Sequence, residues 1–250
     1  MLCDAQFPEN NLRIFIFDYD SAEDGTIEKD LISKFILRDQ CWKPYQTELM
    51  REILKPEDIF IDIGCHIGYF SVLGSISGCN VTSIDKNLNY IQFLNRTIKQ
   101  NEFENIEVKT MTIDDKTKKT DIIRTTQNIK LLKISIQGEE VSCINCFLDD
   151  FSKRKIENVI LEVTPKYSNQ YAKTILRLVT FGYKVYDIGN SPQRELEFNT
   201  NHLENLEELY VASIVQLEAY LSILDEGQTN FLLRAPNTLT NQNANTNKEV

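Results

Sequence analysis

The segment from Phe60 to Phe70, FIDIGCHIGYF, constrains the fold of this 250-residue chain more than any other stretch. The nearly continuous apolar run from Ile59 to Ile63 is typical of a central parallel strand covered on both faces, and only Asp62 interrupts it. Gly64 and Gly68 then permit a tight turn in which backbone can approach a ligand, and an apolar helix follows. The segment therefore predicts a strand, a ligand-binding turn and a helix.

The spacing in this turn indicates which ligand fits. It reads Asp-x-Gly-x-x-x-Gly, so the Gly-x-Gly-x-x-Gly fingerprint of dinucleotide binding is absent. A carboxylate at Asp62 would repel a pyrophosphate, but it can accept hydrogen bonds from a cationic amino-acid group. Asp85 ends a second β-rich run roughly 20 residues further on, where an acid that binds both ribose hydroxyls is expected. We therefore expect S-adenosylmethionine as cofactor, the alternative being an ordinary buried glycine turn.

Composition limits the classes of protein and partner. The length suits one large α/β domain with a small extension. A formal charge of -10 disfavours nucleic acid and anionic membranes, which leaves a small molecule or neutral glycan as partner. Without a signal-like start or a long uncharged apolar run, we expect a cytoplasmic protein with no membrane span. The sequence does not indicate an oligomeric state.

The cysteines do not suggest a metal site. Six are scattered along the chain, which favours reduced thiols. Cys143 and Cys146 have CxxC spacing, but there is no second such pair and the chain has only two histidines. We therefore expect two thiols on a helix and no bound metal.

Apolar periodicity predicts strands that alternate with helices. The expected strands are 12–17, 59–63, 80–84, 105–109, 130–136, 158–163, 183–189 and a last edge strand at 231–233. The expected helices are 27–37, where a strand ending in 35–37 is the alternative, 45–54, 70–76, 88–101, 141–151 and 171–181. Residues 116–128 are expected to form a surface excursion, and 208–224 fits either a strand or a helix.

This alternation predicts an α/β fold with a doubly wound, mostly parallel sheet. We expect an N-terminal strand and helix extension over 1–54, a catalytic or binding domain over 55–235, and a disordered tail over 236–250. Ligands of such sheets bind beyond the carboxyl ends of the strands. The polar residues expected at these ends are Asp62, Asp85, the segment Ser135 to Glu140, and Glu162.

Several stretches, in this order and spacing, resemble the FkbM family of S-adenosylmethionine-dependent O-methyltransferases. They lie between about Asp20 and Pro236, and they are CWKPYQTELMREILKPEDIFIDIGCHIGYFS, VTSID, TIDD, LLKISIQGEE and VILEV. The resemblance implies a Rossmann-like class I methyltransferase fold and S-adenosylmethionine as methyl donor. It also implies that the acceptor is a hydroxyl of a sugar, glycan or polyketide-like small molecule.

The resemblance also assigns site residues. The family's cofactor turn corresponds to Asp62, Gly64, Cys65 and Gly68, its ribose acid to Asp85, its lysine-isoleucine-aspartate-x-glutamate-glycine-x-glutamate motif to Lys133, Gly138 and Glu140, and the acid of its next strand to Glu162. Four positions depart from the family pattern. Ser135 replaces the motif's aspartate, Gln137 its glutamate, Lys43 a frequent glutamate, and His66 a common asparagine.

These departures leave the proton acceptor open, because a neutral serine hydroxyl is a poor base at pH 7. His66, Glu140 and Glu162 are the candidates, and an imidazole titrates near neutrality. Lys133 is a further candidate for contact with acceptor or cofactor. Each also has a purely structural interpretation. His66 would pack in the turn, and Glu140 and Glu162 would be carboxylates at a helix or strand end. The stem of Lys133 would lie along its strand with the charge in solvent.

Three functions remain in order of preference. The first is an active O-methyltransferase. The second is a cofactor-binding protein that has lost catalysis and acts as a sensor or assembly partner, as the neutral Ser135 and Gln137 would predict. The third is an RNA ribose 2′-O-methyltransferase that uses Lys43 and Lys133, which the missing aspartate and the net charge disfavour.

Overall fold

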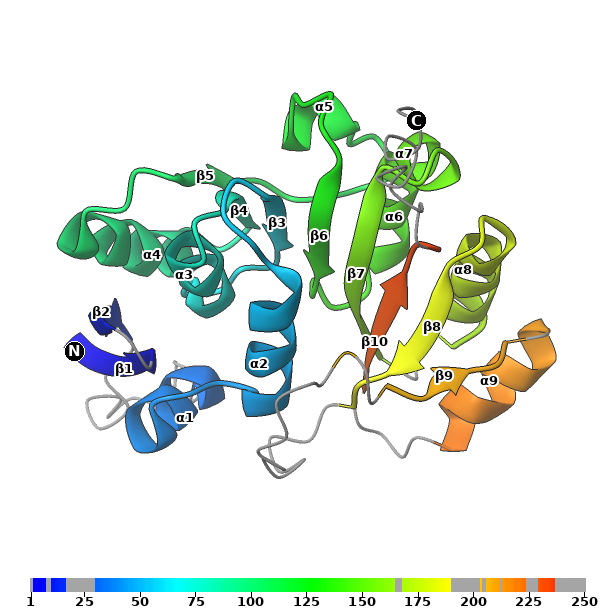
Figure 1. Ribbon diagram of the computed structural model, residues 1–250, viewed down its shortest axis with the longest axis horizontal. Helices are drawn as coiled ribbons and strands as arrows, with labels where there is room; N and C mark the ends of the chain where they lie inside the picture. Colours follow the sequence, from blue (N-terminus) through cyan, green and yellow to red (C-terminus); the bar gives the residue numbers. More distant parts are fainter. Residues whose placement is uncertain are drawn as a thin grey trace, which may run out of the picture.

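An eight-stranded sheet with helices on both faces forms the centre of the protein (Figure 1). The computed structural model describes residues 2–7, 10–16, 30–164, 168–189, 203, 206–211, 213–223 and 229–236. The sheet order is β5-β4-β3-β6-β7-β10-β8-β9. Its strands are β3 (Ile59–Ile63), β4 (Asn80–Asp85), β5 (Ile106–Thr110), β6 (Ile129–Ile134), β7 (Ile156–Val163), β8 (Lys184–Asp187), β9 (Glu208–Leu209) and β10 (Thr229–Arg234).

The pairing confirms the predicted fold class. Strands β3 to β7 pair in parallel, and the chain order reverses between β3 and β6. Strand β10 is inserted antiparallel between β7 and β8, so the sheet is mostly parallel and doubly wound, as predicted. In such a sheet the ligand crevice lies beyond the carboxyl ends of the strands at the reversal.

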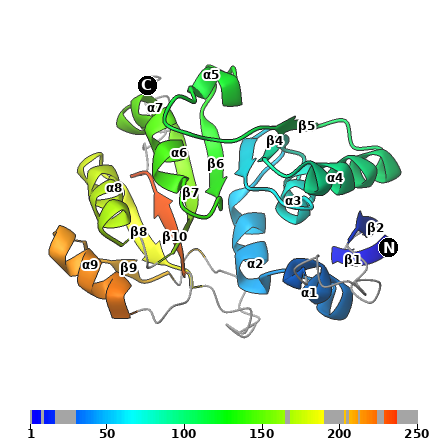
Figure 2. The same ribbon diagram turned by 180° about the vertical axis from the view of Figure 1, so that it is seen from behind.

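Two apolar cores lie on opposite faces of the sheet. The first contains Phe60 and Leu131 and is covered by α2 (Pro44–Ile53), α3 (Tyr69–Ile76) and α4 (Leu88–Asn101). The second contains Ile61 and Leu132 and is covered by α6 (Glu140–Cys146), α7 (Leu148–Ser152), α8 (Ser168–Thr180) and α9 (Ile214–Ile223). Figures 1 and 2 show the two layers from opposite sides. Neighbouring residues of the central strands thus enter different cores, which explains the nearly continuous apolar run.

One predicted strand is misplaced and two segments differ in detail. The expectation of an edge strand at 231–233 is wrong, because β10 pairs with β7 on one side and β8 on the other. Its residues from Thr229 to Leu233 are all buried, and a short apolar run does not tell an interior strand from an edge strand. Residues 208–224 contain both β9 and α9, and the excursion at 116–128 contains the single-turn helix α5 (Lys119–Ile122).

A small N-terminal unit packs against α4. Strands β1 (Leu2–Phe7) and β2 (Asn10–Phe15) form a separate antiparallel sheet, and α1 (Leu31–Asp39) follows. The amide of Phe15 donates to Thr97 Oγ1 of α4 at 3.0 Å. Residues 17–29, where the predicted helix was to begin, and the predicted tail beyond 236 lie outside the described residues. Among the helices that the structure describes, none is long and apolar enough to cross a membrane.

Candidate active site

In the glycine turn after β3, other protein atoms occupy the positions where side chains of Gly64 and Gly68 would project. Gly64 has φ 76°, and a Cβ there would lie 1.9 Å from the carbonyl oxygen of Ser135. Gly68 has φ 89°, and its Cβ would lie 2.3 Å from a methyl group of Leu94. The glycines therefore permit close packing of β6 and α4, and this is a different reason from the predicted approach of a ligand.

Cys65 is turned into the core. Its thiol is buried and lies 3.7 Å from the His66 carbonyl oxygen, and burial raises the pKa of the Cys65 thiol well above its ordinary value. The amides of Gly64 and Cys65 both donate to the Ile84 carbonyl, at 2.8 and 3.0 Å. The assignment of the Cys65 side chain to cofactor binding is therefore not supported, because both its thiol and its amide contact protein.

Asp85 lies where the ribose acid was predicted. It ends β4 and is half-buried, and its two carboxylate oxygens accept backbone hydrogen bonds from His66 at 2.9 Å and Asn87 at 2.8 Å. Each oxygen keeps a second lone pair. The carboxylate is thus fixed against the glycine turn and can still accept two hydroxyl donors.

His66 links the turn to the N-terminal unit. It has φ 54°, its Nε2 lies 3.2 Å from Asp30 Oδ1, and its ring contacts that of Tyr90 at a tilt of 44° with centroids 3.8 Å apart. Asp30 also accepts from the amide of Ser33, which caps α1. The Nδ1 atom of His66 is buried without a hydrogen-bond partner in the described part of the chain. These contacts place His66 beside Asp85 and the start of α1.

Asp62 contacts a protein cation. It is 0% exposed and accepts from Lys133 Nζ at 2.9 Å and Ser71 Oγ at 2.7 Å. The predicted partner, a cationic amino-acid group of the cofactor, is replaced by Lys133 in this structure. Lys133 is also buried, with its ammonium 5.2 Å from the Phe70 ring centroid. Its charge is therefore not in solvent, which excludes the structural interpretation offered for it from the sequence.

Glu162 at the end of β7 forms a second ion pair, with Lys43. Lys43 Nζ lies 3.1 Å from Glu162 Oε2, and the two side chains are 12% and 10% exposed. Burial lowers the pKa of Lys43, Glu162 opposes this effect, and Lys133 adds to it. No described residue donates a hydrogen bond to the other carboxylate oxygen of Glu162, and this oxygen is not fully buried. That oxygen can therefore accept a proton or hydrogen bond from a ligand.

Glu140 has a structural role. It is 1% exposed and accepts from the amides of Ile136 at 3.3 Å and Gly138 at 2.8 Å, and from the Tyr171 hydroxyl at 2.6 Å. Burial and this hydrogen bond raise the pKa of Tyr171. The candidate role of Glu140 as proton acceptor is not supported, because its oxygens hold the loop after β6 against α8.

The two neutral replacements do not supply an acid. Ser135 is half-buried beside the glycine turn, and its amide donates to the Ile63 carbonyl at 2.9 Å. Gln137 is exposed with φ 50°. Among the predicted catalytic residues, Glu162 is thus the one acid that keeps a carboxylate oxygen available.

Gln46 was missed by the sequence reasoning. It lies on α2 one turn after Lys43, is 4% exposed, and its Nε2 has no hydrogen-bond partner among the described residues. An amide donor buried without a partner is costly, so it marks a position where a ligand can supply the acceptor. The available signal was a glutamine on the helix face that otherwise carries Leu49, Met50 and Ile53.

Comparisons with known proteins agree with methyl transfer. Residues 46–160 match the family described as "Tellurite resistance protein TehB", a family of S-adenosylmethionine-dependent methyltransferases. No curated protein matches the sequence. The family match supports the predictions of a methyltransferase and of S-adenosylmethionine as its cofactor.

Solved structures with a similar chain path share little sequence. Precorrin-6y C5,15-methyltransferase from Geobacter metallireducens is 12% identical with a TM-score of 0.47, over 76% of this chain and 86% of that one. The 23S rRNA methyltransferase ErmE is 11% identical with a TM-score of 0.48, over 77% and 66%. SMU.1697c from Streptococcus mutans, solved in complex with SAH, is 10% identical with a TM-score of 0.47, over 76% and 96%.

Proposed function

We propose that this protein is an S-adenosylmethionine-dependent O-methyltransferase of the FkbM type, acting on a hydroxyl of a sugar, glycan or small molecule. The observation that carries the proposal is the position of two carboxylates, Asp85 and Glu162, on one face of the sheet. Asp62 pairs with Ser83 on β4 and with Lys133 on β6, and Lys133 pairs with Ile160 on β7.

Register explains why the two acids share a face. Residues directly paired across parallel strands point to the same face, and residues two apart on one strand do so as well. Asp85 and Glu162 lie two positions beyond Ser83 and Ile160, so both point to the face that carries α2 and α3. They therefore flank the glycine turn, with the strand ends of β3 and β6 between them.

The residues present fit the cofactor at one end of this row. The free lone pairs of Asp85 would accept the two ribose hydroxyls, and the unpartnered Nε2 of Gln46 would donate to the carboxylate of the amino-acid group. The buried ion pair of Asp62 and Lys133, whose charges cancel, would support the turn from the strands β3 and β6. When bound, S-adenosylmethionine supplies an electrophilic sulfonium methyl group.

At the other end, Glu162 would hold the acceptor hydroxyl and take its proton. Lys43 fixes one oxygen of this carboxylate through their 3.1 Å ion pair, which leaves the second oxygen for the acceptor. A positioned general base contributes roughly 10²- to 10⁴-fold in rate. We therefore assign Glu162 as proton acceptor and Lys43 as the residue that positions it.

Cofactor binding is tested by calorimetry with S-adenosylmethionine and S-adenosylhomocysteine. Replacement of Asp85 by Asn should weaken both at least about tenfold, because hydrogen bonds to a charged group contribute about 1.5–3 kcal/mol. Asp149→Asn, at an exposed acid on α7, is the matched control and should bind normally. Equal affinity of the Asp85 variant and wild type would refute the ribose assignment.

Turnover is tested with labelled donor and a panel of sugars and glycans. Glu162→Gln should lower kcat at least about 10²-fold and leave donor affinity unchanged, because it removes the base but keeps the side-chain shape. Full activity of this variant would exclude Glu162 as proton acceptor.

One observation favours a second function, that of a cofactor-binding protein without turnover. Neither Ser135 nor Gln137 carries a charge, and Glu140 is occupied by three donors. Tight donor binding with no product from any acceptor would support this function over the enzyme.

A further inference from the structure

A polar cavity of about 770 Å³ lies at the opposite edge of the sheet from the glycine turn. Its walls come from the amino ends of β3 and β4, from β5, and from the segment that contains and follows α5. Ile59 and the glycine turn stand at opposite ends of β3, about 13 Å apart at 3.3 Å per residue. The cavity is therefore separate from the proposed methyl-donor site and does not depend on its assignment.

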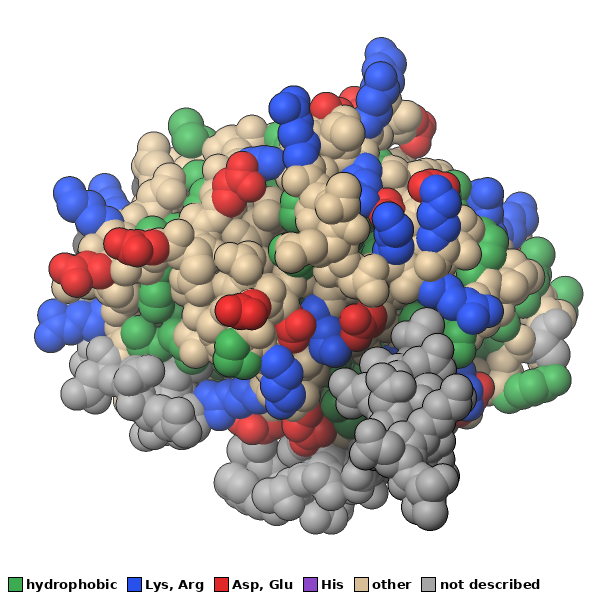
Figure 3. Space-filling view, turned by 45° about the horizontal axis from the view of Figure 1, so that its top comes forward, with side chains coloured by type: hydrophobic (Ala, Val, Ile, Leu, Met, Phe, Trp, Pro, Cys, Tyr) green, Lys and Arg blue, Asp and Glu red, His purple; other side chains and the backbone are tan. Residues whose placement is uncertain are grey.

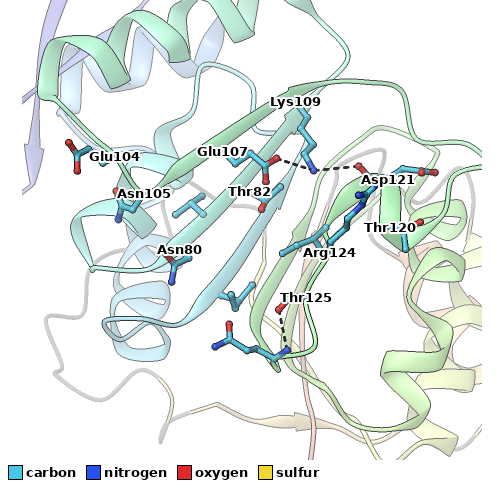
Figure 4. A pocket seen from close by; sticks show the side chains of 14 residues that line it. Asn80, Thr82, Glu104, Asn105, Glu107, Lys109, Thr120, Asp121, Arg124 and Thr125 are labelled. Carbon is cyan, nitrogen blue, oxygen red and sulfur yellow. Dashed lines mark hydrogen bonds and ion pairs between the residues drawn. The ribbon is translucent and has the colours of Figure 1, made fainter.

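The cavity exists because this part of the second face lacks a full-length helix. The chain between β5 and β6 contains only the four-residue α5, whereas α3 and α4 cover the opposite face of the same strands. Figure 4 shows Asn80 and Thr82 of β4 on one side, with Arg124 and Thr125 on the other. A volume of this size suits a ligand as large as a mono- or disaccharide.

Thr82 is the residue that points to a ligand. It lies on β4 on the face that carries Ile61 and Ile84, is 4% exposed and lines the cavity. No described group forms a hydrogen bond with its hydroxyl. Because this hydroxyl faces the cavity and has no partner in the described part of the chain, it can donate to or accept from a ligand hydroxyl.

The charges of the lining are mixed. Lys109 lies 3.3 Å from Glu107 and donates to the Ile122 carbonyl at 2.6 Å, so this cation is already paired. Arg124 is exposed and forms no hydrogen bond or ion pair with described residues, and Glu104 and Asp121 are exposed acids. The surface seen with the top of the molecule forward also shows acidic and basic side chains interspersed (Figure 3). No single ligand charge is therefore favoured.

The chemistry of the remaining lining selects the ligand class. Hydroxyl, amide, carboxylate and guanidinium groups offer donors and acceptors around short aliphatic surfaces of Ile59 and Ile123, and the lining contains no aromatic side chain for stacking a planar ring. We propose that this cavity binds a neutral, hydroxyl-rich small molecule of mono- to disaccharide size.

Binding is tested on the full-length protein with glucose, N-acetylglucosamine, myo-inositol, trehalose and maltose as probes at millimolar concentrations. Isoleucine methyl NMR should show that at least one probe shifts Ile59 and Ile123 while leaving Ile188, which lies in the other core, unchanged. Saturating S-adenosylhomocysteine should not displace the probe, since the two sites lie at opposite edges of the sheet.

Two variants assign the site. Thr82→Val keeps the shape but removes the hydroxyl, and it should weaken the probe about 2- to 10-fold, as expected for one neutral hydrogen bond. Arg124→Ala should weaken it similarly, and because this side chain is exposed and unpartnered the variant should fold even if the first does not. Arg177→Ala, at an exposed arginine on α8, is the control. Absence of shifts with every probe, or equal affinity in Arg124→Ala and wild type, would overturn the proposal.

Discussion

Replacing Lys133 by Met should destabilise the protein by about 3–5 kcal/mol, because it leaves a carboxylate buried without its counter-ion. Asp62 is 0% exposed and would keep only the Ser71 hydroxyl, at 2.7 Å, from its two present side-chain donors. Methionine retains the length of the lysine stem, so the loss of the charge should dominate over any loss of packing.

The double variant isolates the interaction. Asp62→Asn combined with Lys133→Met removes both charges, and a buried pair replaced on both sides is far less costly than one broken on a single side. We therefore expect the double variant to recover at least about 2 kcal/mol of the loss, a coupling typical of residues in direct contact. The relevant contact is the 2.9 Å ion pair between Lys133 and Asp62.

The assay is urea unfolding followed both by Trp42 fluorescence and by far-UV circular dichroism. Coincident transitions would justify a two-state treatment. The expected loss corresponds to a fall in Tm of about 6–20 °C for a chain of this size. If the single Lys133 variant lost less than about 1 kcal/mol, or if the double variant were no more stable than the single one, the buried ion pair would not exist as described.

Three further outcomes follow from the turn and its neighbours. Gly64→Ala should cost about 2–5 kcal/mol of unfolding free energy in urea, because a positive φ strains alanine and its Cβ meets the Ser135 carbonyl at 1.9 Å; near-wild-type stability would contradict this packing. Burial raises the pKa of Asp30, but the hydrogen bond from His66 outweighs this effect and holds the pKa below its ordinary 3.8. The ionised Asp30 therefore contributes stability above pH 3.8, and this contribution is lost as the pH falls through the lower pKa of the folded protein. Asp30→Asn should therefore flatten the acid limb of the stability curve, and an unchanged limb would disprove this. Because burial raises the pKa of Cys65, mass spectrometry should show it alkylated by iodoacetamide in urea but not in the native protein, and rapid native labelling would contradict its burial.

The sequence was sufficient to predict strands alternating with helices between residues 59 and 189 and to place Asp85 at the end of β4. The apolar run before Gly64 and the three- and four-residue spacing over 88–101 arise from local periodicity, and β3 and α4 have the predicted bounds. Asp85 was predicted from its distance along the chain to the glycine turn, a distance that the strand-turn-helix-strand unit imposes.

Side-chain partners depended on tertiary structure. The sequence suggested that Asp62 would meet a ligand, and for Lys133 it offered either contact with acceptor or cofactor or a charge in solvent. Parallel pairing of β3 with β6 instead places the two side by side. The sequence likewise could not show that Lys43 of the N-terminal part reaches Glu162, a residue 119 positions away. Such contacts depend on the register and packing of distant segments, which no local periodicity encodes.

The sequence by itself thus determined an α/β sheet whose glycine turn and following acid suit a nucleoside cofactor, because these features depend on residues close together in the chain. Tertiary structure alone decided that β10 is an interior strand, that Glu140 is used internally while Glu162 keeps an open oxygen, and that a polar cavity remains beside β4. The physical reason is that burial and hydrogen-bond satisfaction are properties of the assembled layers.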